Sequence, residues 1–221
     1  MPLCCPGEGS DTIPTDLPKA GTWRRPMMTG ERRNDILQTL AAMLEQPQAE
    51  KTTTANLARR LALSEAALYR HFASKAQMFE GLIVFIEETL FTRINRITGE
   101  KAGGLEQVEA ILALLLAFSE KNPGMTRVLI AEALVHENER LQARINQVHD
   151  RLEATLRQSL RLAAGVDATA LPAFNPGAYA NLLLCFVIGR WHQFAKSGFR
   201  RSPLADWEQQ WPLLQPKKTA S

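Results

Sequence analysis

From residue 31 onward, apolar side chains recur every three or four positions, the spacing of one face of an α-helix. The first run consists of Ile36, Leu37, Leu40, Met43 and Leu44. Pro47 follows this run and predicts the end of a first helix, because proline cannot continue a helical hydrogen-bond ladder.

Two short helices and a long one are predicted next, over 54–63, 64–70 and 75–98. Hydroxyl side chains stand where each should begin, and such side chains satisfy the free amides of a helix N-terminus. These caps are Thr53 or Thr54, Ser64 and Ser74. Glycines after position 98 predict the end of the long helix.

Five further helices are predicted, over 105–121, 123–135, 137–164, 176–197 and 203–213. Two Asn-Pro-Gly sequences, at 122–124 and 175–177, separate helices, with proline tolerated at the first helical position. The stretch 165–175 is the one irregular connection of note. No strand pattern or repeat is present, so the chain is predicted to be all-α.

Residues 1–30 are rich in Pro, Gly, Thr and Ser and lack periodicity, which is typical of a disordered extension. We therefore divide the chain into four parts: an extension over 1–30, a small helical domain over 31–76, a larger helical domain over 77–214 and a tail over 215–221.

Composition narrows the class of protein without fixing its function. The net charge of +3 permits nucleic acid as a partner but does not argue for one. Cys4, Cys5 and Cys185 do not form a disulfide framework, and Cys185 is predicted to be a buried small residue. The apolar runs are too short to span a bilayer, and no secretory signal is present. We expect a cytoplasmic protein.

An enzyme is not expected. The four histidines, His71, His136, His149 and His192, are scattered and lack metal-ligand spacing. No glycine-rich phosphate loop and no serine nucleophile motif is present. We therefore expect no catalytic residues, no metal and no cofactor.

Two short helices joined by a few residues, followed by a long third helix, have the layout of a helix-turn-helix. Leu57, Ala58 and Leu61 are predicted to face inward from the first short helix, and Leu68 and Phe72 from the second. The pattern alone leaves open a helical hairpin that merely packs.

The candidate DNA-contacting residues follow from this layout. Short side chains at the start of the second helix let it approach base edges in the major groove, whereas hydroxyl and cationic groups suit phosphates. The predicted set is Thr53, Thr54, Ser64, Glu65, Ala66, Ala67, Tyr69, Arg70, His71 and Lys75.

The stretches 53–58 and 63–75 closely resemble the helix-turn-helix signature of the TetR family of bacterial regulators. The resemblance implies an N-terminal three-helix domain and a larger C-terminal helical dimerisation domain. Ala62 and Ala73 depart from the family, which usually has Gly and Pro there. Because positive φ strains alanine, we expect the turn at Ala62 to be shaped differently.

From about residue 31 to 214 the chain resembles a narrower group, the bacterial nucleoid occlusion factors. The stretches that carry this resemblance are 64–72, 85–87, 92–95, 122–124, 144–147 and 211–213. It implies a dimer, or a dimer of dimers, on specific chromosomal sites. It also implies that the DNA-bound protein antagonises polymers of FtsZ, the tubulin-like division GTPase, and so blocks septum formation over the chromosome.

The same resemblance implies an FtsZ-binding surface formed by Phe85, Arg93, Leu114, Lys121 and Asn122. Lys121 stands where the group usually has Arg, and Ala117 stands for Gly. Lysine keeps the charge but loses the bidentate fork. From the residues alone, Phe85 and Leu114 are explained equally well as core, and Arg93 and Lys121 as solvated charges.

The helix over 176–197 carries an apolar stripe that must be buried, either in its own core or against a second copy. Its residues are Tyr179, Leu183, Phe186, Gly189 and Phe194. We predict a homodimer through this stripe, because two half-sites held together raise affinity for DNA.

Two other functions remain open. A ligand-responsive repressor with the same fold would need a cavity and would release DNA on binding its effector. A helical interaction module would not bind DNA at all. The division antagonist is preferred, and for it no small-molecule ligand is expected.

Overall fold

The computed structural model describes residues 31–46, 52–135, 137, 139–166 and 175–216. The expectations for 1–30, 167–174 and 217–221 lie outside these described residues. Within the described ranges the regular secondary structure is helical, in agreement with the all-α prediction. No helix in these ranges is long and apolar enough to cross a membrane.

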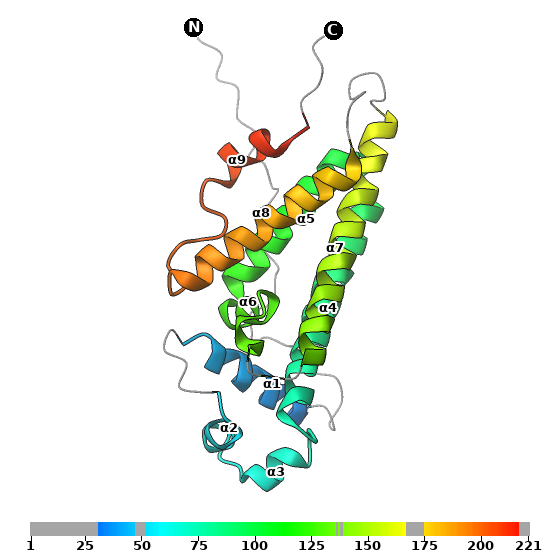
Figure 1. The fold of residues 1–221 in the computed structure, drawn as a ribbon. Coiled ribbons are helices and arrows are strands. Elements are labelled where there is room, and N and C mark those ends of the chain that lie inside the picture. The colour runs from blue at the N-terminus through cyan, green and yellow to red at the C-terminus, as the bar shows by residue number, and fades with distance from the viewer. Residues whose placement is uncertain (1–30, 47–51, 136, 138, 167–174, 217–221) are drawn as a thin grey trace, which may run out of the picture.

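Three short helices form a layer at one end of the molecule, at the bottom of Figure 1. They are α1 (Glu31–Leu44), α2 (Thr54–Arg60) and α3 (Glu65–Tyr69). The long helix α4 (Lys75–Glu100) starts in this layer and runs into the rest of the protein. The expected domain boundary after residue 76 thus falls in the first turn of one continuous helix.

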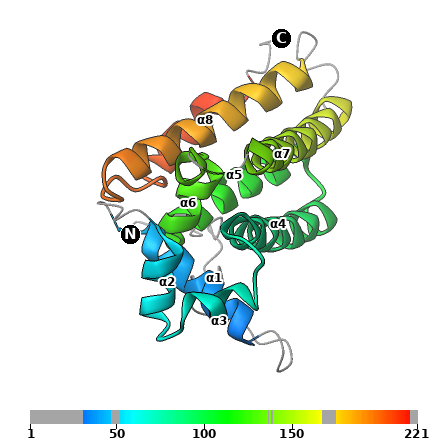
Figure 2. The same ribbon diagram turned by 60° about the horizontal axis from the view of Figure 1, so that its bottom comes forward.

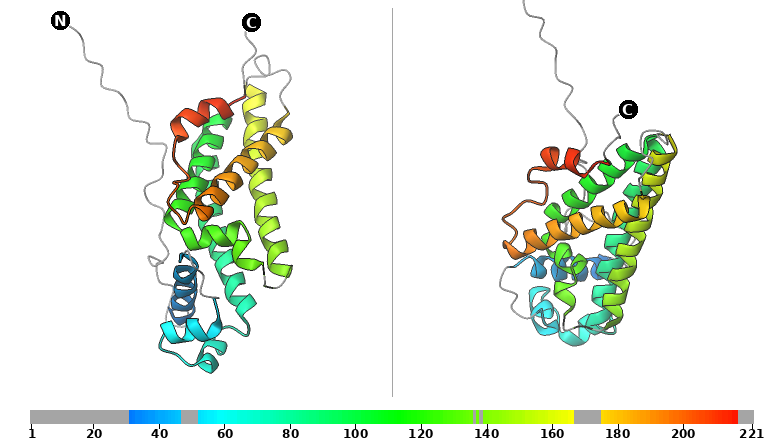
Figure 3. Two further views of the ribbon diagram at one scale, coloured as in Figure 1. Left: turned by 60° about the vertical axis from the view of Figure 1, so that its left-hand side comes forward. Right: turned by 45° about the horizontal axis from the view of Figure 1, so that its top comes forward.

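The remaining helices form the larger layer of the protein (Figures 1 and 2). They are α5 (Gly104–Lys121), α6 (Pro123–Leu129), α7 (Glu139–Val166), α8 (Pro176–Lys196) and α9 (Trp207–Leu214), with a short 3-10 helix, η1 (Glu132–Leu134), after α6. In Figure 3, α9 lies at the end opposite α2 and α3. Helix α7 packs along both α5 and α8.

The predicted N-terminal caps are confirmed. Thr53 accepts a hydrogen bond from the amide of Asn56, and Ser64 accepts one from the amide of Ala67. Ser74 likewise accepts from the amide of Gln77. Each cap satisfies a backbone donor that the helix itself leaves without a partner.

Helix α5 forms the centre of the core, since every residue from Ala110 to Ser119 is buried. Trp191 of α8 is fully buried beside it, and its ring nitrogen donates to the carbonyl oxygen of Leu115 at 3.3 Å. Burying a side chain of this size contributes strongly to the stability of the fold, and the hydrogen bond satisfies the one polar group of the ring. The two helices are therefore held together by packing and by a satisfied polar group.

Several predicted boundaries are wrong, and the backbone explains why. Helix α6 ends at Leu129 rather than near 135, because Ala131 adopts a left-handed conformation with φ 59°. Helix α2 ends at Arg60 rather than 63, before the left-handed Ala62. Helix α9 starts at Trp207 rather than 203, after the left-handed Asp206.

Cys185 is exposed, so the prediction that it is buried is wrong. The inward face of α8 is formed by Leu183, Leu184 and Val187, and Cys185 lies on the opposite side. Its apolar neighbours in the sequence concealed this, because a helix turns by about 100° at each residue.

Candidate nucleic-acid and partner interfaces

The turn between α2 and α3 keeps a left-handed residue at Ala62, with φ 52°. The amide of Leu63 then donates to the carbonyl of Ala58 at 2.9 Å and closes the turn. The expected change of turn shape is therefore wrong. The left-handed conformation persists although alanine replaces the usual glycine, which costs about 1 kcal/mol of strain.

The outer face of α3 presents small and polar side chains to solvent. Ser64, Glu65, Ala66 and Arg70 are exposed, and Tyr69 is 43% exposed. On the inner face Leu68 is fully buried, and Leu57 of α2 is buried with it. The helix can therefore approach a groove without disturbing its own core. Of the remaining predicted contacts, Ala67 is partly buried.

A side-chain network joins the start of α2 to the start of α3. The hydroxyl of Thr54 donates to Oε2 of Glu65 at 2.8 Å, and the hydroxyl of Tyr69 lies 3.5 Å from Thr54 Oγ1. These three predicted DNA contacts therefore lie together at the exposed edge of the helix-turn-helix.

Two other predicted phosphate ligands, His71 and Lys75, follow α3 in the chain. His71 is partly buried, and its amide donates to the carbonyl of Leu68 at 3.0 Å. The ammonium of Lys75 forms an ion pair with Glu137, so this cation has an acidic partner inside the protein. No local pattern indicates that contact, because the two residues are 62 positions apart.

Exposed arginines of α2 extend the basic surface and were missing from the predicted set. Arg59 and Arg60 close the last turn of α2, and Arg59 donates to the side chain of Asn56 at 2.8 Å. Counting charge segment by segment could have identified them, because residues 52–77 contain four Lys or Arg and one carboxylate, a net charge of +3. The rest of the chain, with 22 of each sign, is neutral.

The small layer is fixed to the larger one by the contact between α1 and α6. A Cβ atom on Gly124 would lie 2.1 Å from the carbonyl oxygen of Ala41, so only glycine permits this crossing. Nη1 of Arg127 donates to the carbonyl of Gln46 at 2.9 Å, just beyond α1. The Asn-Pro-Gly sequence at 122–124 therefore positions the helix-turn-helix.

The five predicted FtsZ-contacting residues separate into two groups. Phe85, Arg93 and Lys121 are partly exposed, as a partner surface requires. Leu114 and Asn122 are fully buried, and the Asn122 side chain donates to the carbonyl of Phe118 at 2.9 Å. The prediction that these two residues contact the partner directly is therefore corrected. A side chain without exposed surface can only pack beneath a partner surface.

The predicted dimer stripe also separates. Leu183 and Phe194 are buried in the protomer's own core, and Phe186 packs near Trp207 with ring centroids 6.4 Å apart. Tyr179 is partly buried, whereas Gly189 is exposed with open space beside it. The stripe is thus mostly an intrachain contact, because α8 has its own core to cover.

The opposite face of α8 is exposed, and most of its side chains between 178 and 189 are apolar or small. It includes Ala178, Leu182, Cys185 and Gly189, with the polar Asn181 beside them. Leu182 is 52% exposed, which is unusual for leucine in the middle of a long helix. Small neighbours on either side would let another helix approach closely.

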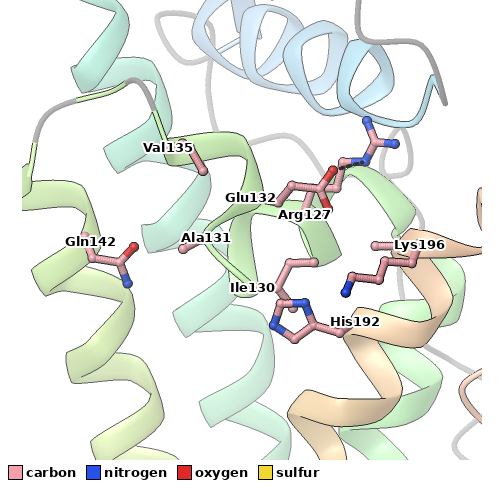
Figure 4. A pocket seen from close by; sticks show the side chains of 9 residues that line it. Arg127, Ile130, Ala131, Glu132, Val135, Gln142, His192 and Lys196 are labelled. Carbon is pink, nitrogen blue, oxygen red and sulfur yellow. Dashed lines mark ion pairs between the residues drawn. The ribbon is translucent and has the colours of Figure 1, made fainter.

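A surface hollow of about 660 Å³ lies between the end of α6, the start of α7 and the end of α8 (Figure 4). Ile130, Ala131 and Val135 supply apolar walls, and His192 and Lys196 stand on the α8 side. Arg127 is turned toward Glu132, with its Nε 3.5 Å from a carboxylate oxygen. Its charge is therefore already balanced at the edge of the hollow.

His149 of α7 is partly buried and lies against the fully buried Trp191, with ring centroids 6.2 Å apart. Burial lowers the pKa of His149, and a hydrogen bond with the backbone of Leu129 opposes this only in part. Its Nε2 atom has no hydrogen-bond partner among the described residues. The neutral imidazole is therefore favoured where α6, α7 and α8 meet.

Comparison with known families agrees with this geometry. Residues 36–82 match the model for bacterial regulatory proteins of the tetR family, and residues 102–218 match the model for the tetracyclin repressor-like C-terminal domain of the SlmA-like type. The first match contains α2, the turn and α3. The second contains α5 to α9.

Curated relatives are similar over most of the chain. Nucleoid occlusion factor SlmA of Marinomonas sp. is 48% identical over 184 residues, which cover 83% of this chain and 93% of the relative. The SlmA of Alteromonas mediterranea is 50% identical over 180 residues, covering 81% and 92%. That of Vibrio cholerae is 49% identical over 184 residues, covering 83% and 93%.

Solved structures share the fold at low sequence identity. A TetR-family regulator from Agrobacterium tumefaciens superposes with a TM-score of 0.69 at 15% identity, covering 87% of this chain and all of the other. The ketosteroid regulator KstR2 of Mycobacterium tuberculosis gives a TM-score of 0.62 at 17% identity, covering 89% and 100%. The expected TetR-like architecture is confirmed.

Proposed function

Because the chain belongs to the family of nucleoid occlusion factor SlmA, within the TetR-type DNA-binding proteins, we propose that it keeps cell division away from the chromosome. In this proposal it binds specific chromosomal sites through α2 and α3 and, while bound, antagonises FtsZ polymers. The identity of about half of the aligned residues, which cover more than four fifths of the chain and include both the helix-turn-helix and the larger layer, carries the proposal.

The DNA-binding part rests on the exposed face of α3 and the basic segment around it. Small side chains at Ser64 and Ala66 permit close approach to base edges, and Tyr69 and Arg70 flank them. The net charge of +3 on residues 52–77 attracts phosphates to the same face. We expect cytoplasmic protein concentrated on the nucleoid.

The FtsZ-binding part rests on the partly exposed residues Phe85 and Arg93 of α4 and Lys121 at the end of α5. Phe85 and Arg93 are eight positions apart, which separates them by about 80° around α4, so both can contribute to one side of the helix. A partly exposed aromatic ring beside cationic side chains suits an apolar segment that carries negative charge.

The dimer is proposed to form through the exposed face of α8, around Leu182 and Gly189, with α7 beside it. This assignment replaces the buried Leu183 and Phe194 by residues that a second copy can reach. Two helix-turn-helix units joined in this way would hold two half-sites, and two dimers side by side would cover a longer site.

Sedimentation of GTP-assembled FtsZ tests the proposal. FtsZ is mixed with this protein alone, with the protein and a duplex selected by it from random sequence, or with the protein and a shuffled duplex. We expect less polymer in the pellet only with the selected duplex. Phe85→Ala should abolish this loss and keep DNA binding, whereas Val84→Ala, on the neighbouring exposed face of α4, should change neither.

The hollow beside His192 favours a second candidate function, a ligand-responsive repressor. Its volume lies within the range of about 300–1,000 Å³ typical of small-molecule sites. Unchanged FtsZ polymer together with intact binding to the selected duplex would reject the division antagonist and favour this repressor. A protein that neither lowered the amount of FtsZ polymer nor bound the selected duplex would instead reject DNA binding itself.

A further inference from the structure

Glu65 is the only carboxylate within residues 52–77, where four cationic side chains accompany it. It occupies the first position of α3 and is exposed on the face that approaches DNA. A carboxylate in this place repels the phosphate backbone and weakens binding to every sequence. Its presence therefore needs a compensating contribution to recognition.

The hydrogen bonds around Glu65 indicate what that contribution is. Its Oε2 accepts the proton of the Thr54 hydroxyl at 2.8 Å, and a hydroxyl has only one proton to donate. The Thr54 oxygen can then only accept from the Tyr69 hydroxyl, 3.5 Å away. The orientation of both hydroxyls is thus set by the carboxylate.

The same contact joins two helices. Thr54 is the first residue of α2, and Glu65 is the first residue of α3, eleven positions later. A hydrogen bond to an ionised acceptor is roughly twice as strong as one between neutral groups. It fixes the start of α3, which reads base edges, against the start of α2, which meets phosphates.

We propose that Glu65 is a positioning residue for DNA recognition. It holds the hydroxyls of Thr54 and Tyr69 in the orientation that meets the DNA, and it does not itself contact a base. This inference rests on the proposed DNA-binding function. It gives Glu65 a role different from the direct contact that the sequence alone suggested.

Removal of the carboxylate should have opposite effects on two kinds of DNA. Glu65→Ala should weaken binding to the selected duplex by about fivefold, because the hydroxyls lose their orientation. It should at the same time strengthen binding to a shuffled duplex, because a repelling charge is gone. Glu65→Gln removes the charge but keeps an acceptor oxygen for Thr54, so it should bind the selected duplex more tightly than Glu65→Ala does and should strengthen binding to the shuffled duplex to the same extent.

A double-mutant cycle shows whether Glu65 acts through Thr54. Thr54→Val removes the hydroxyl at nearly constant shape, and the double variant Thr54→Val with Glu65→Ala should bind no more weakly than the worse single variant. Fluorescence anisotropy with both duplexes provides the affinities, and thermal unfolding followed by circular dichroism verifies that each variant is folded.

Three results would overturn the proposal. If Glu65→Ala strengthened binding to both duplexes equally, charge repulsion alone would explain the effect of Glu65. A loss confined to one base pair of the selected site would indicate a direct contact with cytosine. Additive losses of binding free energy in the double-mutant cycle would show that Glu65 acts independently of Thr54. If the wild-type protein itself showed no preference for its selected duplex, the proposed function would fail instead.

Discussion

Lys75, in the first turn of α4, forms an ion pair with Glu137, which lies between η1 and α7. The two side chains are 31% and 14% exposed, so the pair is largely shielded from water. Lys75 belongs to the predicted phosphate-binding set, and Glu137 belongs to the larger layer. A phosphate that approaches Lys75 therefore competes with a carboxylate of the protein's own.

This competition predicts that Glu137→Gln strengthens binding to all DNA sequences alike, by about threefold, because Lys75 becomes fully available to phosphate. Lys75→Ala should have the opposite effect, weakening all sequences and lowering the slope of log affinity against log salt by about 0.9. Fluorescence anisotropy with selected and shuffled duplexes at several salt concentrations measures both.

Glu139→Gln is the matched control, since Glu139 is an exposed carboxylate two residues further along. It should leave the affinity nearly unchanged. If the Glu137 and Glu139 substitutions changed DNA affinity equally, a general charge effect would explain the result without the ion pair. If Lys75→Ala weakened some sequences more than others, a phosphate contact at Lys75 would be contradicted.

The left-handed Ala62 predicts a stabilising substitution. Ala62→Gly should raise the free energy of unfolding by up to about 1 kcal/mol, because glycine adopts positive φ without strain. Urea denaturation measures the change. Ala154→Gly, at an exposed position inside α7, should lower the same quantity by about 1 kcal/mol. Destabilisation by both substitutions would show that Ala62 is not strained.

The crossing of α1 and α6 predicts a severe effect at Gly124. Gly124→Ala should lower the free energy of unfolding by about 3 kcal/mol, because its Cβ would overlap the backbone of Ala41, which cannot move aside alone. Gly99→Ala is the control, since nothing lies within 4 Å of a Cβ there. A small loss at Gly124 would mean that α6 shifts away from α1 at little cost.

Local signals along the chain were sufficient to predict most of the fold. The caps at Thr53, Ser64 and Ser74 were predicted correctly, because each depends on a side chain and an amide three residues away. The order of helices followed from periodicity and from the prolines at 123 and 176. The helix boundaries near Ala62, Ala131 and Asp206 were missed, since alanine gives no indication of positive φ and a single aspartate gives only a weak one.

Contacts between distant segments could not be predicted. Leu114 lies in the part of α5 from Ala110 to Phe118, which is apolar on every side, so periodicity could not tell a surface position from a core one. The same difficulty assigned Leu183 to a dimer interface, although it is buried in the core of its own protomer. The pairing of Lys75 with Glu137 depends on how α7 meets α4, which local sequence does not encode.

The exposed face of α8 predicts where the dimer can be disrupted. Leu182→Glu should shift the protein from dimer to monomer, because it places a charge in an apolar contact that a second copy would bury. Leu213→Glu is the matched control, since Leu213 of α9 is 82% exposed and lies outside that face. Sedimentation equilibrium gives the masses. If only the control variant Leu213→Glu dissociated the dimer, the interface would have to be assigned to α9.

The partly buried His149 predicts a loss of stability in mild acid. Its pKa is lowered in the folded protein, chiefly by burial, so the unfolded chain binds the proton more readily. The stabilising contribution of the neutral ring is complete above the ordinary pKa of 6.5 and decreases as the pH falls below that value. Urea denaturation between pH 5 and 8 should therefore show the free energy of unfolding falling toward the acid end. His149→Gln should flatten this dependence, whereas His192→Gln, at an exposed position on α8, should leave it unchanged. An identical acid loss in the His149 variant would assign the proton uptake to another group.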